Sequence, residues 1–267
     1  MAPLLGGIRL SLMSDELYGD SNWVGLEHYR ELFADERYAI ALRNTALYTL
    51  LSLAVILPLA LLLAQWIRMT FARSRPILTF CLLMPGLTPP AVLALLFLLV
   101  FHGREGLLNQ LFVIPFGGNP IHWLKDPNFI LPALVLQSVW RWTGFITFFL
   151  LAGMEAVPRT YYEAAHLESN SRWRVFYLVI LPQLRPILLF GAVYLVVDAF
   201  SLFSGSYVLL GGSGGTADAG LLLVSYTYQS AFTFGKFGTA AAIGFSIAPF
   251  LLGLLWLCVA WPKRIKT

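Results

Sequence analysis

Long apolar stretches make up most of this chain, and polar residues gather in the links between them. A helix that crosses a lipid bilayer needs about 20 consecutive, mainly apolar residues, whereas barrel strands would show alternating apolar and polar positions. Residues 107–124 are apolar too, but Pro and Gly interrupt them and predict an external or interfacial helix and loop. The pattern predicts an all-α integral membrane protein with about five transmembrane helices. The predicted spans are residues 44–67, 76–101, 128–154, 186–210 and 237–262.

Five prolines interrupt the first, second and fifth of these spans. Each proline removes a backbone donor and kinks or unwinds a turn of helix. In lipid the freed carbonyl needs another partner, so such places either pack against protein or line a wet cavity. The prolines concerned are Pro58, Pro85, Pro89, Pro90 and Pro249.

Composition excludes a soluble globule and a disordered chain. Apolar residues make up 58% of the 267 residues and charged residues 12%, about half the share of an ordinary soluble domain. The net charge of +4 comes from scattered Lys and Arg that flank apolar stretches, which indicates membrane topology and no nucleic-acid partner. Cys81 and Cys258 lie within apolar stretches and are expected to be core residues. The four histidines show no metal-ligand spacing.

The distribution of basic residues predicts the orientation. Links 68–75 and 155–185 and the tail 263–267 carry ten Lys and Arg, whereas 1–43, 102–127 and 211–236 carry seven over a greater length. The positive-inside rule then places the C-terminus in the cytoplasm and the N-terminus outside. The expected organisation is an external segment 1–43, a membrane domain 44–262 and a cytoplasmic tail 263–267.

The longest cytoplasmic link, residues 155–185, reads as a short helical hairpin. Pro158 suits a helix start and Asn170 suits a left-handed turn. From the residues alone, the hairpin either seats in a groove of another protein or lies on lipid headgroups. Residues at helical spacing are Tyr161, Ala164, Ala165 and Glu168 before the turn, and Trp173, Phe176, Tyr177 and Ile180 after it.

Part of this hairpin resembles the EAA loop of ABC importer permeases. The matching residues are Tyr162-Glu163-Ala164-Ala165, then Ile180-Leu181-Pro182 and Arg185-Pro186. Specifically, the chain resembles permeases of binding-protein-dependent sugar importers of the maltose-permease large-subunit type, from about residue 20 to 260. Further stretches agree in order and spacing: residues 22–29 (NWVGLEHY), Arg43-Asn44-Thr45, Leu83-Met84-Pro85 with Pro89 and Pro90, residues 106–109, and residues 203–212.

The resemblance implies a type I ABC importer permease fold and a set of partners. These are ATP-binding subunits, a second homologous permease and an extracytoplasmic solute-binding protein that delivers a sugar, all at a bacterial or archaeal plasma membrane. It also implies that Glu163 to Ser169 sit in a cleft on the ATPase. The ATPase-coupling residues carried over from the family are Glu163, Ala164, Ala165, Ser169, Leu181 and Pro182.

Two features depart from the family pattern. The family places Gly where this chain has Ser169 followed by Asn170, so the turn is expected to use Asn170 or the docking to be weaker. The family also carries one more spanning helix before residues 22–29. Residues 1–13 are too short to span, so the first family helix is expected to be missing here.

The chain contains no GxxxxGK[ST] phosphate loop. It is therefore expected to be a translocation subunit and not an enzyme, with no cofactor, metal or catalytic residue of its own. ATP and Mg²⁺ would belong to the partner ATPase. Closure of that ATPase would switch the spans between inward- and outward-facing states.

Charged and aromatic residues inside the spans are candidates for the substrate path. Arg141 and Asp198 either pair with each other or line a wet cavity and bind sugar hydroxyls, since a charge within a span is costly. The aromatic residues either pack in the protein or stack on a sugar face. The substrate-path candidates are Arg141, Trp142, Asp198, Phe203 and Tyr207, with Trp140 and Phe200 as further aromatic residues.

Three alternatives to a sugar permease stay open at this point. The first is an ABC permease for another solute, such as a glycerol phosphate or a polyamine, because substrate choice lies largely with the binding protein. The second is a stand-alone secondary transporter, which would normally show an inverted repeat that we do not see. The third is a membrane enzyme, which would need clustered His, Asp or Glu that this chain does not show.

Overall fold

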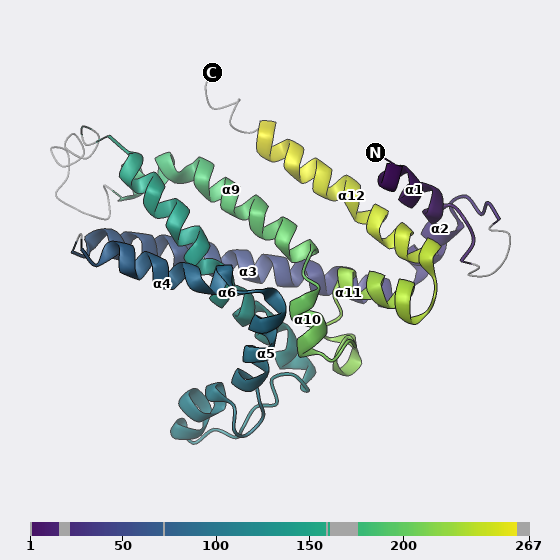
Figure 1. Ribbon diagram of the computed structural model, residues 1–267, viewed down its shortest axis with the longest axis horizontal. Coiled ribbons are helices and arrows are strands. Elements are labelled where there is room, and N and C mark those ends of the chain that lie inside the picture. Colours follow the sequence, from purple (N-terminus) through teal and green to yellow (C-terminus); the bar gives the residue numbers. More distant parts are fainter. Residues whose placement is uncertain (1, 16–21, 72, 159, 161–175, 261–267) are drawn as a thin grey trace. The chain divides into compact units, whose positions relative to one another are not determined.

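The computed structural model describes residues 2–15, 22–71, 73–158, 160 and 176–260 (Figure 1). The described residues form helices and no β-strand beyond one isolated bridge between Met13 and Trp23. The predicted all-α fold is confirmed. The α-helices are α1 (Ala2–Ser11), α2 (Glu27–Ala34), α3 (Glu36–Met69), α4 (Arg75–Leu87), α5 (Pro90–Val100), α6 (Pro127–Ala156), α9 (Leu181–Phe200), α10 (Ser204–Leu209), α11 (Leu223–Tyr228) and α12 (Phe237–Ala260). Short π- or 3-10 turns are η1 (Asn109–Val113), η2 (Ile114–Phe116), η3 (Phe176–Ile180), η4 (Thr216–Asp218) and η5 (Gln229–Thr233).

Three described helices, α3, α6 and α9, are long and apolar enough to cross a membrane. Helix α3 contains the predicted span 44–67, and α6 contains the predicted span 128–154. The pair α4 and α5 would count as a fourth span, and α12 begins where the fifth predicted segment begins.

The predicted span 76–101 is interrupted at its prolines, as the sequence indicates, and forms two helices. Helices α4 and α5 meet at a break with a bend of 98°, so this segment is a broken span or a re-entrant loop. The prolines explain the break. Thr88 is extended (φ −72°, ψ 133°), because the residue before a proline is driven out of the helical region, and Pro89 and Pro90 cannot donate backbone hydrogen bonds.

The predicted span 186–210 also differs from the structure. Helix α9 starts earlier, at Leu181, and ends at Phe200, and α10 resumes at Ser204. At the break the Ser201 N–H donates to the Asp198 carbonyl (3.0 Å) and the Ser201 hydroxyl donates to the Val197 carbonyl (2.8 Å). Serine side chains compete in this way with the backbone hydrogen bonds of a helix. The mainly apolar composition of the segment did not predict that α9 ends at Phe200.

The chain divides into two compact units. The first unit comprises residues 1–50, 89–137 and 197–257, and the second comprises 51–88, 138–196 and 258–267. In the first unit α5 packs on α10 (Figure 1), and a core forms between α2, the start of α3 and the segment 221–243. The buried residues of that core are Leu32, Tyr38, Ala41, Leu221, Leu223, Tyr226 and Ile243.

The core of the second unit lies between α3, α6 and α9, with α4 packed against it. Small residues on α3 allow close approach of the helices, as is common in membrane proteins. The buried residues on α3 are Ile56, Ala60, Ala64 and Ile67; those on α6 are Trp142, Ile146, Leu150, Leu151 and Met154; and those on η3 and α9 are Phe176, Ile180, Leu184 and Leu195.

We predict that Gly144→Ala destabilises the second unit. A Cβ at Gly144 would overlap the backbone carbonyl of Leu82 on α4, so α4 and α6 would have to separate, and overpacking of this kind costs about 1–3 kcal/mol or more. The measurement is the thermal unfolding midpoint of the purified protein in detergent. Gly244→Ala on α12 is the matched control, because a Cβ there meets nothing within 4 Å; equal midpoints for both variants would contradict the close approach.

Candidate transport and coupling sites

Arg141 lies within α6, in the second unit, beside an indole ring. Its guanidinium carbon is 4.5 Å from the centroid of the Trp142 ring, a distance typical of a cation–π contact. The Arg141 Nε is buried and has no hydrogen-bond partner within the described part of the chain. A buried donor without a partner costs free energy, which makes Arg141 a candidate for contact with a hydrogen-bond acceptor.

Trp142 is a core residue, 6% exposed, in a row of aromatic rings between α6 and α9. Its ring meets Tyr194 edge to face with centroids 4.9 Å apart, and Phe145 at 5.6 Å. Trp140, by contrast, is 58% exposed. The sequence offered no way to distinguish these two tryptophans, and the structure places Trp142 in the packing beside Arg141. A stacking role for Trp142 toward a sugar stays a prediction.

The other predicted charge, Asp198, is half-buried on α9. It belongs to the first unit, whereas Arg141 belongs to the second. The predicted pairing of these two side chains stays a prediction.

Phe203 and Tyr207 lie together in a cluster of five aromatic rings in the first unit, which we call the aromatic row. The Phe203 ring centroid is 4.9 Å from that of Tyr207 and 4.8 Å from that of Tyr228. Sequence reasoning did not identify Tyr228, Phe232 and Phe237 as part of this cluster. The spacing of four residues between Tyr228 and Phe232 was a usable signal. The aromatic row consists of Phe203, Tyr207, Tyr228, Phe232 and Phe237. Phe200 instead meets Phe250, at 5.7 Å.

The predicted coupling residues fall in two groups. Glu163, Ala164, Ala165 and Ser169 lie outside the described residues. Leu181 and Pro182 are the first two residues of α9, which follows directly on the π-turn η3. Arg75 at the start of α4 is 3.6 Å from the Glu155 carboxylate near the end of α6.

A partly buried polar network in the first unit holds the segment 211–236 against the start of α3. Arg37 donates from Nε and Nη2 to the Asp218 carboxylate, at 2.8 and 2.9 Å. The Asn44 amide donates to the carbonyls of Asp218 and Leu221, and the Leu223 N–H donates to the Thr45 hydroxyl. The Asn44-Thr45 pair, identified in the sequence only by resemblance, therefore has a structural role in binding the backbone of residues 218–223.

We predict that Asn44→Ala destabilises this network. Two carbonyls would lose their donor at a site where Asn44 is 3% exposed, and an unpaired buried polar group costs about 1–3 kcal/mol. Asn128→Ala is the control, since the exposed Asn128 side chain bonds only to Asp126 two residues away. Thermal unfolding in detergent should show a clear drop for Asn44→Ala alone; equal drops would mean that the contacts to residues 218–221 carry no stability.

Several apolar helices and a half-buried arginine within one of them are features of a multi-pass membrane protein. Residues 40–267 match the family described as "Binding-protein-dependent transport system inner membrane component", and the chain belongs to this family. It is thus an inner-membrane permease component of a binding-protein-dependent transport system, and the family recognised from the EAA loop is confirmed.

Two relatives cover most of the chain. The arabinooligosaccharides transport system permease protein AraP of Bacillus subtilis (strain 168) is 32% identical over 228 residues, which are 85% of this chain and 72% of AraP. The trehalose/maltose transport system permease protein MalF of Thermococcus litoralis is 30% identical over 258 residues, 96% of this chain and 85% of MalF. Both relatives are permease proteins, so the family assignment holds across nearly the whole length.

Among solved structures, the chain is similar to a chain of a bacterial ABC transporter involved in the import of the acidic polysaccharide alginate. The TM-score is 0.85 at 20% sequence identity, over 100% of this chain and 90% of that chain. At this identity the similarity concerns the fold, which is therefore that of an ABC importer permease.

Proposed function

We propose that the chain is the membrane-spanning subunit of an ATP-driven importer that takes up a sugar delivered by an extracytoplasmic solute-binding protein. The observation that carries this proposal is the identity of about a third, over most of the chain, with permeases named for arabinooligosaccharides and for trehalose and maltose. A lactose transport permease of Rhizobium radiobacter, 28% identical over 92% of this chain, supports the same solute class.

The partners follow from the family. One solved relative is a bacterial alginate ABC transporter in complex with an alginate pentasaccharide-bound periplasmic protein, which supports a solute-binding protein as a partner here. Because this chain contains no phosphate loop, the proposal assigns ATP and Mg²⁺ to partner ATPase subunits. We propose that these subunits bind the loop around Glu163 and that a second homologous permease completes the complex. We also propose that the C-terminus lies in the cytoplasm.

Arg141 is the proposed solute contact within the membrane. Its buried Nε–H would donate to a sugar hydroxyl or to the carboxylate of an acidic sugar, and the Trp142 ring holds the guanidinium in place. A half-buried cation within a span repels a polyamine, so Arg141 favours a neutral or anionic solute over that alternative. In the first unit, Phe203, Tyr207 and Asp198 stay further candidates for the solute path.

Co-purification tests the assembly. The tagged chain is extracted in mild detergent, and every protein that co-purifies is identified by mass. The proposal predicts an ATP-binding subunit and a second permease in the same complex. Recovery of the chain alone, folded and monodisperse, would favour a stand-alone secondary transporter.

A further inference from the structure

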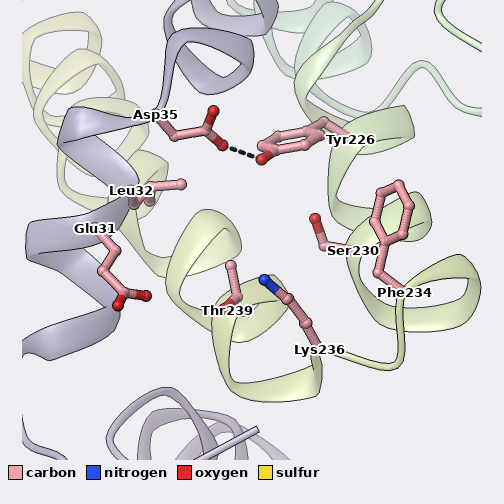
Figure 2. A pocket seen from close by; sticks show the side chains of 8 residues that line it. All are labelled: Glu31, Leu32, Asp35, Tyr226, Ser230, Phe234, Lys236 and Thr239. Carbon is pink, nitrogen blue, oxygen red and sulfur yellow. Dashed lines mark hydrogen bonds between the residues drawn. The ribbon is translucent and has the colours of Figure 1, made fainter.

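A cavity of about 550 Å³ with charged, polar and apolar lining residues lies in the first unit, whereas Arg141 belongs to the second. Its size falls within the range of small-molecule sites. Figure 2 shows α2 lining one wall, with the segment from α11 to the start of α12 on the other. By the proposed orientation the cavity opens on the extracytoplasmic side. The lining residues are Glu31, Leu32, Asp35, Tyr226, Ser230, Phe234, Lys236 and Thr239.

The walls of this cavity are held in place before any ligand arrives. The Tyr226 hydroxyl donates to the Asp35 carboxylate (Figure 2), and burial raises the pKa of Tyr226 above its ordinary value, which keeps the hydroxyl proton in place. Thr239 donates from its N–H and its hydroxyl to the Asp15 carboxylate. The Lys236 N–H closes a turn by donating to the Ser230 carbonyl at 2.8 Å. Ligand binding would therefore require little further ordering of the backbone, so its cost in conformational entropy would be small.

Glu31 and Lys236 contribute opposite charges to the same cavity without pairing. Neither Glu31 nor Lys236 takes part in the Arg37–Asp218 and Arg75–Glu155 ion pairs or in the Asp15–His28 contact. In Figure 2 the Lys236 ammonium extends into the cavity from the wall opposite Glu31. The site thus offers a strong acceptor and a strong donor to one ligand.

An apolar surface lies beside these charged groups. The Phe234 side chain is 55% exposed, and Leu32 is buried in the floor. A simple anion would be repelled by the Glu31 carboxylate, and a simple cation would be repelled by the Lys236 ammonium. A purely apolar ligand would displace water from both charges without replacing its hydrogen bonds. A sugar ring matches the lining, because its hydroxyls both donate and accept while its C–H face is apolar.

We propose that this cavity is an extracytoplasmic carbohydrate-binding subsite, distinct from the Arg141 site, in which Glu31 accepts from and Lys236 donates to sugar hydroxyls beside the Phe234 ring. The inference rests on the proposed function and adds a second place where this chain touches its solute.

Cysteine protection gives a readout confined to the cavity. The full importer complex, in nanodiscs, carries Phe234→Cys in a Cys81→Ser, Cys258→Ser background, and labelling by a maleimide is followed with and without maltose, lactose or arabinotriose. At least one of these sugars should slow labelling at position 234. Phe116→Cys is the matched control, because Phe116 is 84% exposed on the external link 102–127, and its labelling should not change.

Charge variants identify the groups responsible. Glu31→Gln and Lys236→Gln should each raise the half-protecting sugar concentration about tenfold, the usual effect of losing one hydrogen bond to a charged group. Glu105→Gln and Lys125→Gln, at exposed positions of the external link, should leave it unchanged. Unfolding midpoints equal to that of the parent would show that the variants are folded.

Three outcomes would overturn the subsite: no protection by any of the three sugars, protection that survives both charge variants, or equal protection by glycylglycine, which would indicate a zwitterion site. ATP-driven sugar uptake by the unmodified complex is measured in parallel. Uptake without protection rejects the subsite alone, whereas absence of uptake rejects the proposed function.

Discussion

Glu163→Lys is expected to abolish attachment of the ATPase while leaving the protein inserted in the membrane. Glu163 opens the EAA pattern of the cytoplasmic link, and the proposed function places this link in a cleft on the ATPase. A reversal of charge within such an interface juxtaposes like charges or leaves a buried charge unpaired, which costs several kcal/mol. The recovery of the ATPase with the tagged chain should fall below a tenth of the parent level.

Glu105→Lys is the matched control for this variant, because it makes the same charge change on the exposed external link. Membrane insertion is checked for both variants by extraction yield and by a monodisperse profile in detergent. Normal recovery of the ATPase with Glu163→Lys would reject the coupling role of Glu163, whereas loss in both variants would show a general effect of added charge.

Arg141→Gln is expected to lower solute uptake by at least tenfold in an assembled complex. Glutamine keeps polar groups in the span but loses the cation and its position over the Trp142 ring, and a hydrogen bond to a charged group is worth about 1.5–3 kcal/mol. Arg141→Lys should recover only part of the uptake, since an ammonium lacks the planar Nε–H donor. The measurement is initial-rate uptake into proteoliposomes.

The control is Trp140→Ala, which changes the exposed neighbour of Arg141 and should leave uptake near the parent level. ATPase recovery and unfolding midpoints separate a transport defect from misassembly. Full uptake by folded Arg141→Gln would remove Arg141 from the substrate path.

Hydrophobic length predicted the positions of α3 and α6 well, because a span of about 20 apolar residues is imposed by the bilayer itself. The interruptions were harder to predict. The double proline at Pro89-Pro90 was visible, but the size of the bend depends on what packs on each side of it. The break after Phe200 coincides with Ser201, whose hydroxyl donates to the Val197 carbonyl, but hydroxyls make the same bond inside continuous helices, so this residue alone does not predict a break.

In the candidate site, too, the sequence indicates some features and does not indicate others. Arg141 could be identified as a candidate from the sequence, since a charge in the middle of an apolar stretch is a functional-site hypothesis in a membrane protein, and its role stays a prediction. The Arg37–Asp218 pair joins residues 181 positions apart, and no local pattern says which acid such an arginine will meet. The cavity of Glu31 and Lys236 was not predictable for the same reason, because α2 and the start of α12 are brought together only by the fold.

ATP-dependent uptake by the reconstituted complex tests the central claim most directly. Proteoliposomes containing this chain, its co-purified permease and its ATPase are supplied with ATP inside and with the sugar and its solute-binding protein outside. The account predicts sugar accumulation that requires both ATP and the binding protein. Accumulation driven by an ion gradient without ATP, or equal accumulation without the binding protein, would contradict it.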